Sequence, residues 1–183
     1  MNGRSQRTRR GWSSRVSIPL HAILFASLAC CTHLSVQPEL IPSTPQIGVL
    51  AGRVEFEGRE EYLPRTLRRE SASDLVLTYR WSADTSRNDQ PDLLTLFNPL
   101  TLLGFPTGAS TASASGHLEI RSGDRSLRTY DARATVRRIN HLYSGDSLTE
   151  IRRQAILAVR DNLDAQLEAD LQRLSALLSS HTP

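Results

Sequence analysis

Alternating apolar and polar residues predict four β-strands in the middle of the chain. The pattern is clearest over residues 75–81, where leucine and aromatic residues occupy every second position. A strand points successive side chains to opposite faces, so this pattern indicates a half-buried strand. The other predicted strands cover residues 53–57, a segment marked by Leu118 and Ile120, and residues 130–137.

The last two predicted strands are joined by residues 122–125, whose sequence Ser-Gly-Asp-Arg is typical of a turn. We therefore expect these strands to pair as an antiparallel hairpin. Leu127 is out of phase with Tyr130, which predicts a bulge or a change of register between the two residues.

A long amphipathic helix is predicted over residues 147–178, which contain neither glycine nor proline. Ser147 and Glu150 have the spacing of a capping box, in which two side chains satisfy free backbone amides. Arg160 and Asp164 are expected to form an i,i+4 ion pair on the polar side. The apolar residues recur every three or four positions: Leu148, Ile151, Ala155, Val159, Leu163, Leu167, Leu171, Leu174 and Leu178.

This helix is too long for the predicted strands. At 1.5 Å per residue it measures about 45–50 Å, whereas a strand of six residues measures about 20 Å. Its far end therefore either frays or packs on the region around Ile47, or it provides a docking surface or coiled-coil seam. A seam of that kind would make the chain a homo-oligomer through its C-terminal helix.

Together these elements predict an α+β fold. We expect a small, largely antiparallel sheet of about four strands with the long C-terminal helix packed on one face. Residues 59–73 are charged and contain Pro64, which is expected to begin a short helix ending at Arg69.

Charge is unevenly distributed along the 183 residues. All 22 basic residues are arginine, and five of them lie within residues 1–29, which contain no acidic residue. The other 17 arginines are set against 19 acidic residues, so the rest of the chain carries a net charge of −2. Phosphate recognition needs a basic face, so nucleic-acid binding is not expected.

The N-terminus has the order of a secretory signal peptide. The basic residues 1–15 precede an apolar run, residues 16–29, which ends in small side chains. This run is shorter than the roughly 20 residues that cross a bilayer. Residues 8–12 resemble a twin-arginine signal, so the general secretory and twin-arginine export routes both stay open.

The end of this signal, Ala26-Ser-Leu-Ala-Cys30, resembles the lipobox of bacterial lipoprotein precursors. The resemblance implies that Cys30 receives a diacylglycerol, that the signal is cut before it, and that the new amine is acylated. The residue directly after Cys30 is Cys31. It is not the aspartate that retains such proteins at the inner membrane. An outer-membrane anchor facing the periplasm is therefore implied. An ordinary cleaved signal peptide is the alternative.

Residues 30–46 contain three prolines and no sustained apolar period. They are interpreted as a lipid-anchored tether, semi-extended where proline is dense. Residues 47–183 are interpreted as a single α+β periplasmic domain with an apolar insertion at residues 93–105.

The insertion, residues 93–105, is the most apolar stretch after the signal and carries no charge. As a helix it would measure about 20 Å, too short for a bilayer core of about 30 Å. Either its side chains pack in the core, or it is an exposed loop that contacts the bilayer or a partner. Residues 107–116 after it are small and expected to be mobile. The candidate contact residues are Leu94, Leu96, Phe97, Leu100, Leu102, Leu103 and Phe105.

The sequence contains no recognisable catalytic or metal-binding pattern. His117 and His141 are too few for a typical zinc triad, and two adjacent cysteines cannot build a zinc site. A nucleophile elbow and a phosphate-binding loop are both missing. We therefore expect neither enzymatic activity nor a cofactor or bound metal.

Three features of the body form a recognisable combination: residues 73–78, the Gly116–Arg138 hairpin and the helix beginning at Ser147. In these features the body resembles small periplasmic lipoprotein domains of the curli-secretion and penicillin-binding-protein-activator type. It implies a non-enzymatic envelope module that is held at the membrane by its lipid and contacts an envelope protein partner. It transfers no binding residue. The alternatives are a secreted periplasmic protein that binds a small apolar ligand, and an envelope enzyme without a recognisable motif.

Overall fold

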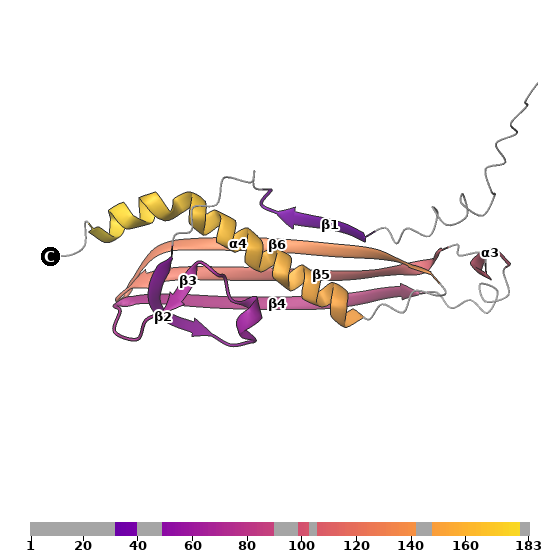
Figure 1. Cartoon of the computed structure of the whole chain (residues 1–183), viewed down its shortest axis with the longest axis horizontal. Coiled ribbons are helices and arrows are strands. Elements are labelled where there is room, and N and C mark those ends of the chain that lie inside the picture. Colours follow the sequence, from indigo (N-terminus) through magenta and orange to yellow (C-terminus); the bar gives the residue numbers. More distant parts are fainter. Residues whose placement is uncertain (1–31, 40–48, 90–98, 103–105, 142–147, 180–183) are drawn as a thin grey trace, which may run out of the picture.

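The computed structural model describes residues 32–39, 49–89, 99–102, 106–141 and 148–179. These residues form a curled sheet whose long strands lie beneath a single long helix (Figure 1). The elements in chain order are β1 (Thr32–Gln37), β2 (Leu50–Phe56), the 3-10 turn η1 (Glu60–Tyr62), β3 (Leu67–Arg69), β4 (Leu75–Asp89), α3 (Pro99–Leu102), β5 (Pro106–Ser122), β6 (Arg125–His141) and α4 (Leu148–Ser179).

The sheet has six strands in the order β1-β6-β5-β4-β2-β3. β1 to β6, β6 to β5 and β5 to β4 pair antiparallel, whereas β2 pairs parallel to both β4 and β3. The predicted sheet of about four largely antiparallel strands is therefore wrong: the described sheet is larger, mixed and curled. The α4 helix does cross one face of it, as expected (Figure 1).

The central strands are also much longer than the sequence pattern indicated. β4 has 15 residues, and β5 and β6 have 17 each. Residues 107–116, expected to be mobile, form the first half of β5. Serine, alanine and glycine have weak strand preference, but β5 is hydrogen-bonded along both edges, which overrides that preference.

Two strands lie in segments that were interpreted differently. β1 falls within the predicted tether and pairs with β6 through all six of its residues. The predicted short helix from Pro64 to Arg69 is wrong: β3 forms its second half, and the nearby turn η1 ends before Pro64. Such short strands carry little pattern of their own and depend on a partner strand to form.

The predicted hairpin of β5 and β6 is confirmed. Gly123 occupies the turn with a φ of 56°, a conformation that glycine adopts without steric cost. A register shift follows, because Ile120 faces Arg128 whereas Arg121 faces Ser126. Leu127 is thus the extra residue, close to where the sequence predicted an irregularity.

The long helix is confirmed as α4, and its apolar stripe is buried as far as Leu174. Because strands of 17 residues reach about 55 Å, the helix is no longer than the central strands, contrary to the sequence estimate, although its C-terminal end projects past the sheet (Figure 1). The α4 helix packs tightly on β5 at Gly116. A Cβ at that position would lie 2.5 Å from Val159 Cγ1. Ser147, the expected cap, lies outside the described residues.

The polar residues of α4 hold the segment between β2 and β4. Asp164 accepts hydrogen bonds from the backbone amides of Arg65 and Thr66, both at 3.0 Å, and from Thr66 Oγ1 at 2.8 Å. Arg160 donates to the carbonyl oxygen of Glu61 at 2.7 Å. Arg160 and Asp164 are both buried, so their predicted role as an exposed i,i+4 pair is wrong.

Candidate functional site

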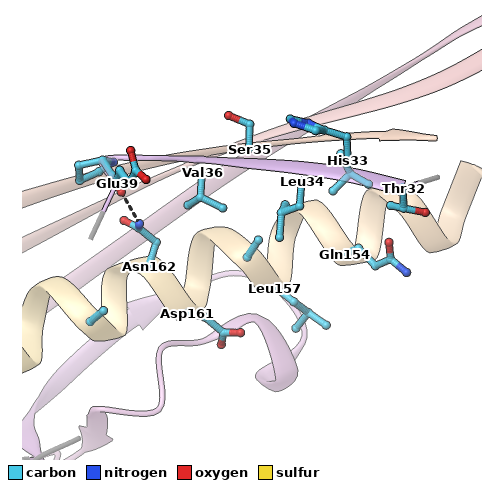
Figure 2. A pocket seen from close by; sticks show the side chains of 14 residues that line it. Thr32, His33, Leu34, Ser35, Val36, Glu39, Gln154, Leu157, Asp161 and Asn162 are labelled. Carbon is cyan, nitrogen blue, oxygen red and sulfur yellow. Dashed lines mark hydrogen bonds between the residues drawn. The ribbon is translucent and has the colours of Figure 1, made fainter. Parts of the chain in front are cut away.

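A groove of about 940 Å³ runs between the edge strand β1 and the helix α4 (Figure 2). The sheet curls so that β1 stands away from the helix, and few contacts join the two elements. Apolar side chains from both elements and from β6 line the groove: Leu34, Val36, Val136, Leu157, Ala158 and Ala165.

The strand wall of the groove follows from the alternation of β1. Leu34 and Val36 point toward α4, whereas His33 and Ser35 point to the opposite face (Figure 2). Leu34 is 53% exposed, and it is one of two large apolar side chains described as exposed. Behind it Val136 is fully buried on the adjacent strand β6. The groove therefore leaves an apolar surface open to water, which is costly unless another molecule covers it.

One end of the groove is closed by a polar clamp. Asn162 Nδ2 on α4 donates to the carbonyl oxygen of Pro38, directly after β1, at 2.8 Å (Figure 2). Gln166 Nε2 donates to Asn162 Oδ1 at 2.8 Å and to the carbonyl oxygen of Asp131 at 2.9 Å. Asn162 is buried, so these bonds fix the end of β1 to the helix and set the width of the groove.

Acidic groups lie near this clamp. Glu39 follows Pro38 and lines the groove, whereas the Asp161 side chain of α4 points away from β1 (Figure 2). Asp161 Oδ1 accepts from both Nε and Nη2 of Arg160, so its charge is already paired. Glu39 is therefore the acidic group that favours a cationic group at the clamped end of the groove.

The outer edge of β1 is a second feature of this site. β1 is the terminal strand of the described sheet and has β6 on one side only. In an antiparallel pair, alternate residues direct their N–H and C=O groups away from the partner strand. Within the described part of the chain, those groups of β1 have no strand to pair with, so the edge can accept one more.

The two body histidines do not come together. His117 Nδ1 lies 2.9 Å from Asp131 Oδ1, and this pair is exposed on the sheet face opposite α4. His141 is the last residue of β6, ten residues further along the strand than Asp131. Among the described residues, no group of three or more His, Cys, Asp or Glu could hold a metal ion.

A buried polar cluster joins the far half of α4 to β6. Asp170 accepts from Arg128 Nε at 2.9 Å and from the Tyr130 hydroxyl at 3.2 Å. Burial, reinforced by the Asp170 charge, raises the pKa of Tyr130 to about 12. Burial likewise raises the pKa of Tyr79, whose hydroxyl has no hydrogen-bond partner. These groups lie in the helix–sheet interface and serve packing.

The residues that the sequence marked as candidates lie elsewhere. Leu100 and Leu102 belong to α3, where the neighbouring Thr101 is 3% exposed. The remaining candidates, Cys30, Leu94, Leu96, Phe97, Leu103 and Phe105, lie outside the described residues. Sequence reasoning missed the groove because β1 was assigned to a tether. The alternation of Leu34 and Val36 was the signal available.

Comparison with protein-family models, with curated proteins and with solved structures finds no match to this chain. The described helices also include none that is long and apolar enough to cross a membrane. The site must therefore be interpreted from its own geometry.

Proposed function

We propose that this protein is a lipid-anchored bacterial envelope protein and acts as a non-enzymatic interaction module. The anchor is Cys30, and the folded body faces the periplasm from the outer membrane. The observation that carries this proposal is the position of the start of β1 relative to the apolar connection between β4 and β5.

Strand register places both features at one end of the sheet. Thr32 pairs with Arg138, which pairs with Ser110, which in turn pairs with Arg87. β4 ends two residues after Arg87, and β5 begins four residues before Ser110. The connection that contains residues 93–105 therefore leaves and re-enters the sheet at the end where β1 begins (Figure 1).

This arrangement supports a defined orientation at the membrane. Cys30 precedes Thr32 by two residues, and two extended residues span about 7 Å. A lipid on Cys30 would hold this end of the sheet at the bilayer, with the apolar connection beside it. The turn at Gly123 lies at the opposite end of the sheet and would face away from the membrane. A second, weak contact with lipid then costs little additional entropy.

The described surface supports interaction more than catalysis. His117 and Asp131 are paired but lie exposed on the sheet face, where no described residue shields a substrate from water. The apolar groove and the open edge of β1 are features of binding surfaces.

Replacing Cys30 tests the anchor. In a Gram-negative host, Cys30→Ala should abolish palmitate labelling and release the protein from the membrane fraction. The matched variant Cys31→Ala should keep both. Palmitate labelling that survives Cys30→Ala, or is lost only in Cys31→Ala, would contradict the proposed anchor.

Replacing Phe97 tests the orientation. In protein without the lipid, Phe97→Asp should leave the melting temperature nearly unchanged and weaken binding to phosphatidylethanolamine–phosphatidylglycerol vesicles. If residues 93–105 are core, the buried charge should instead cost several kcal/mol and unfold a marginal domain. Unfolding on substitution at Phe97, Leu100 and Leu103 alike would refute the lipid contact.

A further inference from the structure

We propose that β1 receives an extended segment of a partner protein as an additional strand, whose alternate side chains fill the groove against α4. The partner segment carries apolar residues at every second position and a basic residue near the clamped end. This inference rests on the proposed interaction function and supplies its mode of recognition; the lipid anchor enters only in the argument against a second copy of this chain.

The backbone of β1 determines what kind of molecule fits. Its outward N–H and C=O groups recur at every second residue and match the spacing of another β-strand. An acyl chain or a compact apolar ligand could occupy the groove but would leave these groups unused. An extended peptide satisfies both the edge and the groove.

The side chains determine which peptide fits. Leu34 and Val36 are two residues apart and face the groove together. An added strand lies about 4.7–4.9 Å from β1 and points alternate side chains to the same face. Apolar side chains on the groove face of the added strand would cover the exposed Leu34 and contact Leu157 and Ala158 on the helix.

A second copy of this chain fits the edge less well. Two β1 strands related by a two-fold axis would run antiparallel, so their Thr32 ends would lie at opposite ends of the pair. Each Thr32 follows Cys30 by two residues, so the two anchors would point in opposite directions.

The charge at the clamped end of the groove determines which peptide residue is favoured there. Glu39 lies at the end where Asn162 clamps Pro38, whereas Asp161 is already paired with Arg160. A basic residue in the peptide at this end would be stabilised, and an acidic one would be repelled.

Two synthetic peptides of identical composition test the proposal. Acetylated Lys-Val-Thr-Val-Thr-Val-Lys has alternating apolar residues, whereas Lys-Val-Val-Val-Thr-Thr-Lys has them in a block. Residues 30–183 are used without lipid, because the described core lies within Thr32–Ser179. Fluorescence anisotropy should show the alternating peptide binding below about 1 mM and the block peptide binding at least about 10-fold more weakly.

Variants on the two faces of β1 provide the matched control. Leu34→Glu places a charge in the groove and should weaken binding of the alternating peptide at least about 10-fold. Ser35→Glu places the same charge on the opposite face and should change binding less than about two-fold. Circular dichroism and melting temperature confirm that both variants fold. Hydrogen exchange should show new protection at alternate amides of β1 when the peptide is bound.

Several results would overturn the proposal. Equal binding of the two peptides would show an apolar groove without strand addition, and no binding at about 1 mM would reject the site. Dimerisation in sedimentation experiments that Leu34→Glu abolishes would assign the edge to a second copy. None of these results depends on lipidation of Cys30, so failure of the anchor and failure of the edge are distinguishable.

Discussion

Gly116→Ala should destabilise the protein, although alanine is the better strand residue. Gly116 lies in the middle of β5, under α4, and pairs with Trp81 and Ala132 on the neighbouring strands. Replacing an interior glycine by alanine ordinarily gains about 0.5–1 kcal/mol through the backbone entropy of the unfolded chain. The packing at this site opposes that gain.

The structure gives the size of the opposing effect. A Cβ at residue 116 would lie 2.5 Å from Val159 Cγ1 and 3.2 Å from both Leu163 Cδ1 and Tyr79 Cε2. All three neighbours are at most 2% exposed, so none can move into solvent. Overpacking of this kind costs about 1–3 kcal/mol, and the net loss should be about 1–2 kcal/mol.

Urea unfolding of residues 30–183 measures this loss, with Trp81 as the sole tryptophan and thus the fluorescence probe. Trp81 packs edge-on against Tyr62 at 5.4 Å, so its emission reports the folded sheet. Ser115→Ala, on the opposite face, is the control. It removes the 2.9 Å contact between the Ser82 and Ser115 hydroxyls and should cost less than about 1 kcal/mol.

A double-mutant cycle decides whether the contact with Val159 is the cause. Val159→Ala alone should cost about 2 kcal/mol because it removes buried methyl groups and leaves a cavity. The double variant Gly116→Ala/Val159→Ala should be at least about 1 kcal/mol more stable than the sum of the single effects. An additive cycle, or a Gly116→Ala protein as stable as the parent, would refute this account of the helix–sheet contact.

Two further predictions concern buried polar groups. Asp164→Ala should lower the free energy of unfolding by about 3–5 kcal/mol, because it leaves two backbone amides and the Thr66 hydroxyl without an acceptor. Thr66→Val should lower it less. If Asp164→Ala were as stable as the parent protein, Asp164 would not hold the segment between β2 and β4. The pKa of Tyr130 is about 12 in the folded protein against 10 in the unfolded chain. The stability that neutral Tyr130 contributes is therefore fully present below pH 10 and is lost as the pH rises toward 12. In urea unfolding curves recorded at several pH values, Tyr130→Phe should reduce the fall of the unfolding free energy between pH 10 and 12. An unchanged dependence of that free energy on pH would count against the assignment.

The confirmed predictions are those in which local pattern and local structure coincide. α4 was predictable because its apolar residues repeat with the helix period, and that stripe is the surface that packs on the sheet. The β5–β6 hairpin was predictable because the turn residues and the alternation of β6 lie close together in the chain. In both elements the pattern that identifies the element lies within one short stretch of sequence, although α4 is then stabilised by contacts with distant strands.

The candidate site was not predictable, because its two walls come from distant parts of the chain. Leu34 and Leu157 lie 123 positions apart and meet at the groove only because β1 pairs with β6 and α4 crosses the sheet. Three prolines around residues 38–45 made this region look like a linker. Apart from the short alternation of Leu34 and Val36, the local sequence does not distinguish this edge strand from an extended linker, since both need a similar extended backbone.

By itself the sequence determined the presence of the long amphipathic helix, the hairpin turn, and the alternating strands whose apolar residues form the core. These features follow from the 3.6-residue and two-residue periods of helix and strand. Tertiary structure alone decided the six-strand order, the parallel pairing of β2, the length of β4 and β5, and the open edge of β1. The physical reason is that strand pairing satisfies backbone hydrogen bonds through space. Small polar residues such as those of β5 therefore become strand once neighbours on both sides supply their partners.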